Sequence, residues 1–201
     1  MGEPPQVILP LPASFEPTRQ IRSTLLISSY AAVRDAGYGK AYLAALPVKH
    51  HAAILEAVAG AWVPIEVGVA HYDACSALGI SHDQQMIIGR AVGEKVKGTL
   101  LGTVVRMARE VGVTPWTVIP QFQRFWNRAF DGGGLYAAKA GPKEVHIEVY
   151  KAPHADCAYW RAALCGLTMG VLDLFCQKAY MQERNPKKRA PGTAQFRIQW
   201  V

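Results

Sequence analysis

The side chains best suited to bind a metal or move a proton are six histidines and four cysteines. His71 and Cys75 make the most promising pair, because residues four apart lie on one face of a helix. Two ligands give only half of a zinc site, and Asp73 does not share that face. His154 precedes another expected helix, where two roles are open: capping of that helix and axial ligation of a haem. The cysteines lack CxxC spacing, so we expect them to stay reduced as small apolar side chains.

Sequence patterns typical of enzymes are absent. The chain has no GxSxG nucleophile elbow, no GxxxxGK[ST] phosphate loop and no dinucleotide-binding GxGxxG after a strand. The glycine-rich stretch 131–134 follows an expected helix and leads into an expected strand, which is the wrong order for a helix N-terminus that holds phosphate. The sequence therefore favours a protein that is not an enzyme.

Large aromatic side chains gather in one stretch of the second half. Such side chains form plain core in most proteins, but together with a few polar groups they also line pockets for small molecules. We predict a pocket for a small, mostly apolar ligand between expected helices at 82–108, 116–130 and 157–175. Its predicted lining consists of Trp116, Phe122, Phe125, Trp126, Trp160, Leu164 and Leu167.

Basic residues exceed acidic ones by 22 to 15, which gives a formal net charge of +7. Such an excess permits anionic partners. Four basic residues fall in one loop bracketed by prolines: Arg184, Lys187, Lys188 and Arg189. Proteins that bind nucleic acid usually add aromatic side chains or a recognition helix to such a patch, and neither is expected here. A solvated loop is therefore the favoured interpretation, with contact to an acidic partner or a nucleic acid as the alternative.

The first half of the chain should position these groups with helices. We expect an extended arm over residues 1–18, with a short strand at 6–9. After the apolar run 24–27, Ser29 is expected to cap a helix that ends at Gly37. Further short helices are expected at 39–46, 48–60 and 66–78.

A longer helix should begin at Ser81, because Ser81 and Gln84 match a capping box. Its apolar residues recur at three- and four-residue spacing and form one broad stripe. Glycines within a helix cost stability, so those in this one predict that another element approaches its backbone closely. They are Gly93, Gly98 and Gly102.

The hydrophobic period changes in the second half. After a helix at 117–130, residues 135–139 and 144–150 are expected to form a hairpin, because apolar and polar side chains alternate in the second segment. The helix at 157–175 carries a strip of small residues that we expect to pack on the sheet: Ala163, Gly166 and Gly170.

Alternating Phe196, Ile198 and Trp200 predict a last strand. The fold class is therefore α+β, with a mostly helical N-terminal half followed by a small antiparallel sheet. Residues 19–201 are expected to form a single domain.

The N-terminal residues and the apolar runs favour a cytoplasmic protein. Glu3 and two prolines stand where a secretory signal carries positive charge. The apolar run 162–172 is shorter than the 18 or more residues of a membrane span.

Several short motifs, each present once, follow one another along the chain in a recognisable order. They are residues 24–37, Leu46-Pro47, Trp62-Val63-Pro64, Ala77-Leu78-Gly79, Ile88-Gly89-Arg90, Thr99-Leu100-Leu101-Gly102, Phe125, Gly132-Gly133, 144–150, 159–170 and Phe196-Arg197-Ile198-Gln199-Trp200. In this order they resemble a family of uncharacterised proteins expanded in myxobacteria, over residues 20–201. The resemblance implies no particular activity or catalytic residue.

The order of helices, hairpin, helix and final strand is more remotely similar to three groups of domains. These are 4-vinyl-reductase-like small-molecule-binding domains, subunits of the TRAPP transport particle and haem-based nitric oxide sensor domains. The resemblance implies an α+β fold around an apolar ligand pocket, often in a dimer. The chain lacks the cysteine-rich metal set of some vinyl-reductase-like domains and the Tyr-x-Ser-x-Arg haem-propionate motif. No cofactor is therefore predicted, and haem is the lesser alternative.

Three functions stay open on this basis. The favoured one is a non-enzymatic cytosolic sensor or adaptor domain that binds a small apolar ligand and reports to a partner. The second is an interaction module without a ligand, which would use a homodimer face or the basic loop 184–189 to hold a protein, an acidic partner or, less favoured, a nucleic acid. The third is a haem-binding gas sensor.

Overall fold

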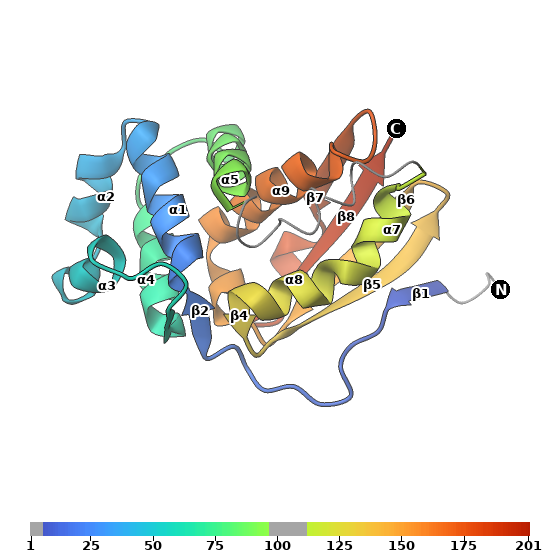
Figure 1. Cartoon of the computed structure of the whole chain (residues 1–201), viewed down its shortest axis with the longest axis horizontal. Helices are drawn as coiled ribbons and strands as arrows, with labels where there is room; N and C mark the ends of the chain where they lie inside the picture. Colours follow the sequence, from blue (N-terminus) through green and yellow to red (C-terminus); the bar gives the residue numbers. More distant parts are fainter. Residues whose placement is uncertain (1–5, 97–111) are drawn as a thin grey trace.

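The computed structural model describes residues 6–96 and 112–201. Short helices lie at one end of the molecule and an antiparallel sheet at the other, with α5 and α9 between them (Figure 1). The fold is therefore α+β, as the sequence predicts. The helices of the first half are α1 (Ser23–Asp35), α2 (Gly39–Ala45), α3 (His51–Leu55), α4 (Ile65–Ser76) and α5 (His82–Val96).

Helix α1 begins at Ser23, so the prediction that Ser29 caps this helix is wrong. The Ser23 hydroxyl donates to the Val58 carbonyl at 2.7 Å and accepts the Ala61 N–H at 3.0 Å, which fixes the start of the helix. Ser29 lies in the middle of α1 and is buried.

Two other helices of the first half differ from their predicted bounds. The predicted helix 48–60 is helical only over a 3₁₀ turn at Val48–His50 and over α3, and Gly60 then adopts a positive φ of 84°. Helix α5 begins at His82, and the Ser81 hydroxyl accepts the Gln84 N–H at 3.2 Å, as the capping pattern predicts. The part of that predicted helix beyond Val96, with Gly98 and Gly102, lies outside the described residues.

A three-stranded sheet that the sequence does not predict joins the two halves. Its antiparallel order is β3-β2-β4, and its strands are only two or three residues long. The segment Trp62-Val63-Pro64, expected only as a separator between helices, is its edge strand β3. The bounds are Gln20–Arg22 for β2, Trp62–Pro64 for β3 and Phe130–Asp131 for β4.

The larger sheet has five antiparallel strands in the order β1-β5-β6-β8-β7. The predicted N-terminal strand, hairpin and last strand are confirmed, and β7 is an additional edge strand. The pairing of Val145 with Ile198 and of Ile147 with Phe196 places the apolar side chains of β6 and β8 on one face. The strands are β1 (Gln6–Leu9), β5 (Gly134–Gly141), β6 (Glu144–Tyr150), β7 (Ala179–Glu183) and β8 (Ala194–Trp200).

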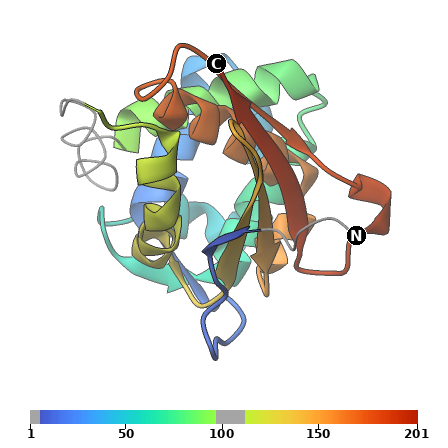
Figure 2. The same ribbon diagram turned by 90° about the vertical axis from the view of Figure 1, so that its right-hand side faces the viewer.

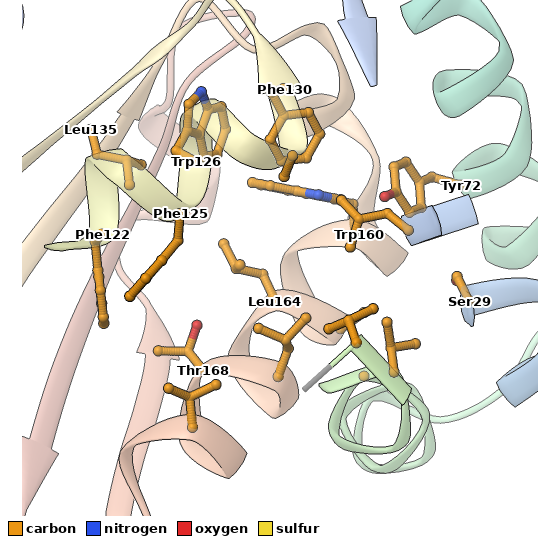
Figure 3. A pocket seen from close by; sticks show the side chains of 18 residues that line it. Ser29, Tyr72, Phe122, Phe125, Trp126, Phe130, Leu135, Trp160, Leu164 and Thr168 are labelled. Carbon is orange, nitrogen blue, oxygen red and sulfur yellow. The ribbon is translucent and has the colours of Figure 1, made fainter. Parts of the chain in front are cut away.

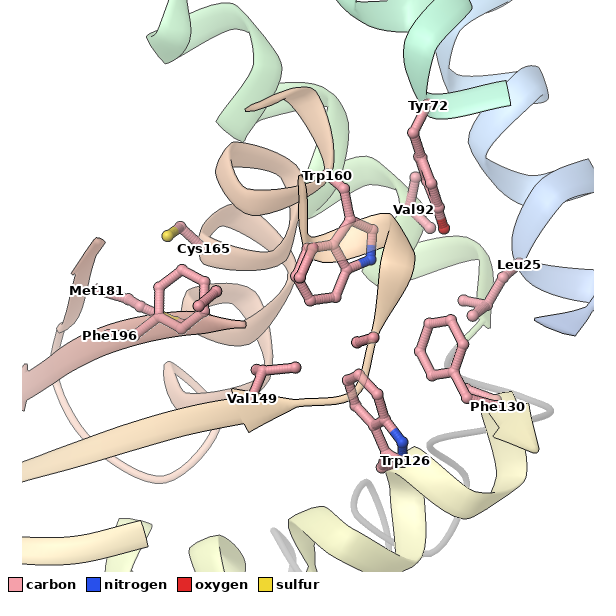
Figure 4. Close-up of a cluster of buried hydrophobic side chains, with 14 of the residues drawn as sticks. Leu25, Tyr72, Val92, Trp126, Phe130, Val149, Trp160, Cys165, Met181 and Phe196 are labelled. Carbon is pink, nitrogen blue, oxygen red and sulfur yellow. The ribbon is translucent and has the colours of Figure 1, made fainter. Parts of the chain in front are cut away.

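Helices of the second half cover the apolar face of this sheet. Figure 2 shows α7 and α8 on one side of the sheet and the loop before β8 on the other side. The predicted helix 117–130 is broken into three parts: α7 (Pro115–Val118), a 3₁₀ turn (Ile119–Gln121) that contains Pro120, and α8 (Phe122–Ala129). Between α9 (Ala158–Leu172) and the sheet, side chains of both form a shared core that includes Cys165, Met181 and Phe196 (Figure 4).

Helix α9 also crosses α5 at very short distance. A Cβ atom built on Gly89 would lie 2.1 Å from the Ala163 carbonyl oxygen, and one on Gly166 would lie 1.9 Å from the Met86 carbonyl oxygen. The small-residue strip of α9 therefore packs against α5, and the prediction that it packs on the sheet is wrong. Two helix backbones can approach this closely only where glycine leaves out the side chain.

Candidate functional site

A cavity of about 170 Å³ lies between α5, α8 and α9 (Figure 3). Of the seven residues that the sequence suggests as lining, the structure places six around it. Three are aromatic residues of α8, one is a tryptophan at the start of α9, and two are leucines further along α9. They are Phe122, Phe125, Trp126, Trp160, Leu164 and Leu167.

The seventh residue, Trp116, lies outside the described cavity lining. Its ring meets the ring of Trp200 edge-on, with centroids 4.7 Å apart, and its indole N–H donates to the Pro142 carbonyl at 2.9 Å. Trp116 therefore packs against the end of the sheet. The 3₁₀ turn between α7 and α8 separates it from the aromatic residues that reach the cavity.

Helices of the first half supply the part of the lining that sequence patterns missed. Leu25 and Ser29 reach the cavity from α1, Tyr72 from α4 and Val92 from α5. Leu25 and Ser29 are four residues apart, so they share one face of α1. A serine inside an apolar helical stripe is the sequence signal that could have indicated a polar point in the lining.

The chemistry of the described lining is almost entirely apolar. Hydroxyl groups come from Ser29, Tyr72 and Thr168, and indole N–H groups from Trp126 and Trp160. No Lys, Arg, Asp or Glu among the described residues lines the cavity. The Trp126 N–H is already bonded, because it donates to the Gly132 carbonyl at 2.8 Å. Such a surface favours an uncharged molecule with few polar atoms.

His154 lies in a box of aromatic rings that borders the cavity. Its ring stacks on Phe130 with centroids 4.4 Å apart and meets Trp160 edge-on at 4.7 Å. The side chain is fully buried, and neither ring nitrogen has a hydrogen-bond partner among the described residues. Burial lowers the pKa of His154 to about 3, so the ring is neutral at pH 7. His154 does not cap α9, whose N-cap residue is Cys157.

His71 connects the cavity lining to the helical end of the molecule. The Tyr42 hydroxyl lies 2.6 Å from Nδ1 of His71, and Ser29 Oγ lies 2.8 Å from Nε2. Burial lowers the pKa of His71 to about 3, so the ring is neutral and carries one N–H. Burial also raises the pKa of the Tyr42 hydroxyl, which therefore keeps its proton and can donate to Nδ1 while Nε2–H donates to Ser29.

His71 and Cys75 are neighbours, as their spacing predicts, with Nε2 and Sγ 3.8 Å apart. Both ring nitrogens already face hydroxyl groups, which leaves neither free for a metal ion. Within residues 6–96 and 112–201, no group of three or more His, Cys, Asp or Glu side chains could hold a metal. The four cysteines, all of them in these ranges, are free thiols.

The basic loop contains two arginines that have intramolecular partners. Arg184 Nη1 lies 2.8 Å from His146 Nδ1, and Arg189 forms an ion pair with Asp156. Lys187 and Lys188 are exposed on a 3₁₀ turn at Pro186–Lys188. Contact of this loop with an anionic partner stays a prediction that would depend mainly on the two lysines.

None of the helices in the described part of the chain is long and apolar enough to cross a membrane. No protein-family model matches the sequence. No curated protein matches it either, so the resemblance to a family expanded in myxobacteria is not supported.

Solved structures of similar fold are haem nitric oxide/oxygen-binding (H-NOX) proteins. The Fe(II) unliganded H-NOX protein from K. algicida has a TM-score of 0.59 and 10% identity, and the match covers 90% of this chain and 97% of that one. A structure from work on haem redox potential and porphyrin distortion has a TM-score of 0.56 and 12% identity, covering 90% of this chain and all of the other. At such identities the likeness shows a shared fold: this chain folds like the H-NOX proteins.

Proposed function

We propose that this protein is a non-enzymatic sensor or adaptor domain that binds a small, mostly apolar molecule between α5, α8 and α9. The observation that carries the proposal is a cavity of about 170 Å³ with an almost wholly apolar lining. Sites for small molecules are concave and lined mainly by apolar and aromatic side chains with a few polar groups, and this cavity has that composition.

The volume and the lining limit what this occupant is. An engineered apolar cavity of about 150 Å³ binds benzene or xenon. A cavity of about 170 Å³ therefore suits a single ring or a short aliphatic chain. The described lining offers no charged side chain, and a charge buried without a partner is strongly unfavourable. The ligand is therefore uncharged.

A haem-binding gas sensor is the second candidate, because the H-NOX proteins share this fold. The described lining does not fit haem. Haem iron is held by His, Cys, Met or Tyr. Of these types only Tyr72 occurs among the described lining residues, and His154, which borders the cavity, is fully buried with Phe130 and Trp126 stacked on its ring. Burial raises the pKa of the Tyr72 hydroxyl, which therefore stays protonated and is a poor iron ligand. The described lining also has no Lys or Arg to pair with the haem carboxylates. A Soret band at one haem per chain after haem addition would favour the haem-binding gas sensor over the domain that binds a small apolar molecule.

Ligand binding can be tested with a panel of uncharged single-ring and short aliphatic molecules that includes benzene and indole. We expect native mass spectrometry to retain some members and thermal unfolding to show a higher Tm with the same members. Leu164→Trp should abolish both effects, because Leu164 points into the cavity (Figure 3) and an indole there fills the space.

The matched control is Ile87→Trp, which places the same indole on the exposed face of α5, where Ile87 is 60% exposed. This variant should keep the ligand-dependent rise in Tm. The proposal fails if no panel member is retained and none raises Tm, or if Leu164→Trp responds to ligand as the unchanged protein does.

A further inference from the structure

The cavity lining includes two hydrogen-bonding groups from different helices, the Tyr72 hydroxyl and the Trp160 indole N–H. Tyr72 is 5% exposed and Trp160 is 4% exposed, and both line the cavity. The indole N–H groups of Trp116 and Trp126 donate to backbone carbonyls, and the Tyr42 hydroxyl is bonded to His71. By contrast, no hydrogen bond joins the Tyr72 hydroxyl or the Trp160 N–H to another residue of the described part of the chain. Neither atom is among the fully enclosed side-chain atoms without a partner, so both are open to the cavity, as is the Thr168 hydroxyl further along α9.

The two groups point toward the same part of the cavity, although they come from different helices. Figures 3 and 4 both show the Tyr72 hydroxyl, from α4, and the Trp160 nitrogen, from α9, on neighbouring sides of the same space. Apolar side chains of Leu25, Val92 and Phe130 surround this region (Figure 4). It therefore combines two hydrogen-bonding groups with an apolar environment.

The chemistry of the two groups selects what they bind. An indole N–H is only a donor, and a tyrosine hydroxyl that keeps its proton also donates. A donor that lines a cavity is satisfied there by ordered water or by an acceptor atom of a bound molecule. A carbonyl oxygen has two lone pairs and can accept from both groups at once. A carboxylate could accept as well, but no cation among the described residues lines the cavity to balance its charge.

We propose that Tyr72 and Trp160 form a carbonyl-binding subsite, and that the ligand is an uncharged single-ring or short-chain ketone, aldehyde or amide. This inference rests on the proposed ligand-binding function and specifies its ligand class. The carbonyl oxygen lies between the two donors, and the apolar body of the ligand extends among Leu25, Val92 and Phe130 toward Leu164.

The test compares three probes of similar size by isothermal titration calorimetry: acetophenone, ethylbenzene and benzoate. We expect acetophenone to bind at least about tenfold more tightly than ethylbenzene, because two hydrogen bonds distinguish them. Benzoate should bind more weakly than acetophenone, because its charge would be buried without a partner.

Tyr72→Phe keeps the ring and removes the hydroxyl, so it should lower the affinity for acetophenone about fivefold to tenfold and leave that for ethylbenzene unchanged. Tyr150→Phe is the matched control, because it removes a tyrosine hydroxyl that donates to Glu148 and does not line the cavity. It should leave the ratio of the two affinities unchanged. Far-ultraviolet circular dichroism checks that both variants are folded.

The outcomes separate this inference from the proposed function. Equal affinities for acetophenone and ethylbenzene, an unchanged ratio in Tyr72→Phe, or tighter binding of benzoate would overturn the carbonyl subsite while leaving a ligand-binding cavity. If none of the three probes and no member of the wider panel binds, both proposals fail together.

Discussion

At the scale of single residues, His154 occupies an environment that suits a hydrocarbon ring better than an imidazole. Phe130 and Trp126 stack on its ring, and its two nitrogens have no partner in the described ranges. Unsatisfied buried polar groups each cost about 1–3 kcal/mol. His154→Phe should therefore raise the free energy of unfolding by about 1–3 kcal/mol, as measured by urea unfolding at pH 7. A loss of stability would indicate that a nitrogen of His154 has a favourable contact.

The two buried histidines also make stability depend on pH. Burial lowers the pKa of His71 and of His154 from 6.5 to about 3. Below pH 6.5 the folded state therefore binds fewer protons than the unfolded state. The contribution of the two neutral histidines to the free energy of unfolding is complete above pH 6.5 and is lost as the pH falls toward 3. Between pH 7 and pH 5 each histidine should remove about 2 kcal/mol from the free energy of unfolding. Urea unfolding at both pH values measures the loss, and His154→Phe should reduce it by about half.

At the scale of elements, the crossing of α5 and α9 depends on two glycines. A methyl group at Gly89 or Gly166 would collide with a backbone carbonyl, which cannot rotate away as a side chain can. Gly89→Ala or Gly166→Ala should therefore lower the free energy of unfolding by about 3 kcal/mol or more. Gly170→Ala is the control on the same helix, because its Cβ would lie 3.2 Å from the flexible Arg90 side chain. It should change stability by less than about 1 kcal/mol, and equal losses in all three variants would contradict this account.

The elements differ in how far the sequence could predict them. Regular alternation predicted β6 and β8, because a strand buried on one face repeats every two residues. Strands β2, β3 and β4 are too short to show a period, and β7 mixes polar and apolar residues at the edge of the sheet. The small-residue strip of α9 predicted a close contact, but spacing within one helix does not tell which partner makes that contact.

At the scale of the whole molecule, the cavity brings together segments that are far apart in the sequence. Neighbouring positions in α8 and α9 could be predicted as lining because their aromatic residues cluster along the chain. Leu25, Ser29 and Tyr72 could not, because their contribution depends on how α1 and α4 pack against the second half. The carbonyl subsite has the same origin, since Tyr72 and Trp160 are separated by 88 positions (160 − 72) in the printed sequence.

A ligand that contacts both halves should stabilise the whole molecule. Binding to the folded state alone adds about 2.7 kcal/mol to the free energy of unfolding when the free ligand is at one hundred times its Kd. We expect acetophenone at that ratio to produce this gain in the unchanged protein, measured by urea unfolding with and without ligand. In Leu164→Trp the same concentration should produce none. A gain in both proteins would place the acetophenone site outside the cavity.

The glycine crossing has a consequence for the recognition of distant relatives. Because backbone carbonyls occupy the space that a Cβ would need at Gly89 and Gly166, any descendant that keeps this crossing has to keep glycine at both positions. The two sites lie 77 positions apart (166 − 89), so a paired requirement at that separation can be searched for in sequences that share little else. Chains that retain both glycines would be candidates to share the cavity, even where overall identity has fallen to the level seen with the H-NOX proteins.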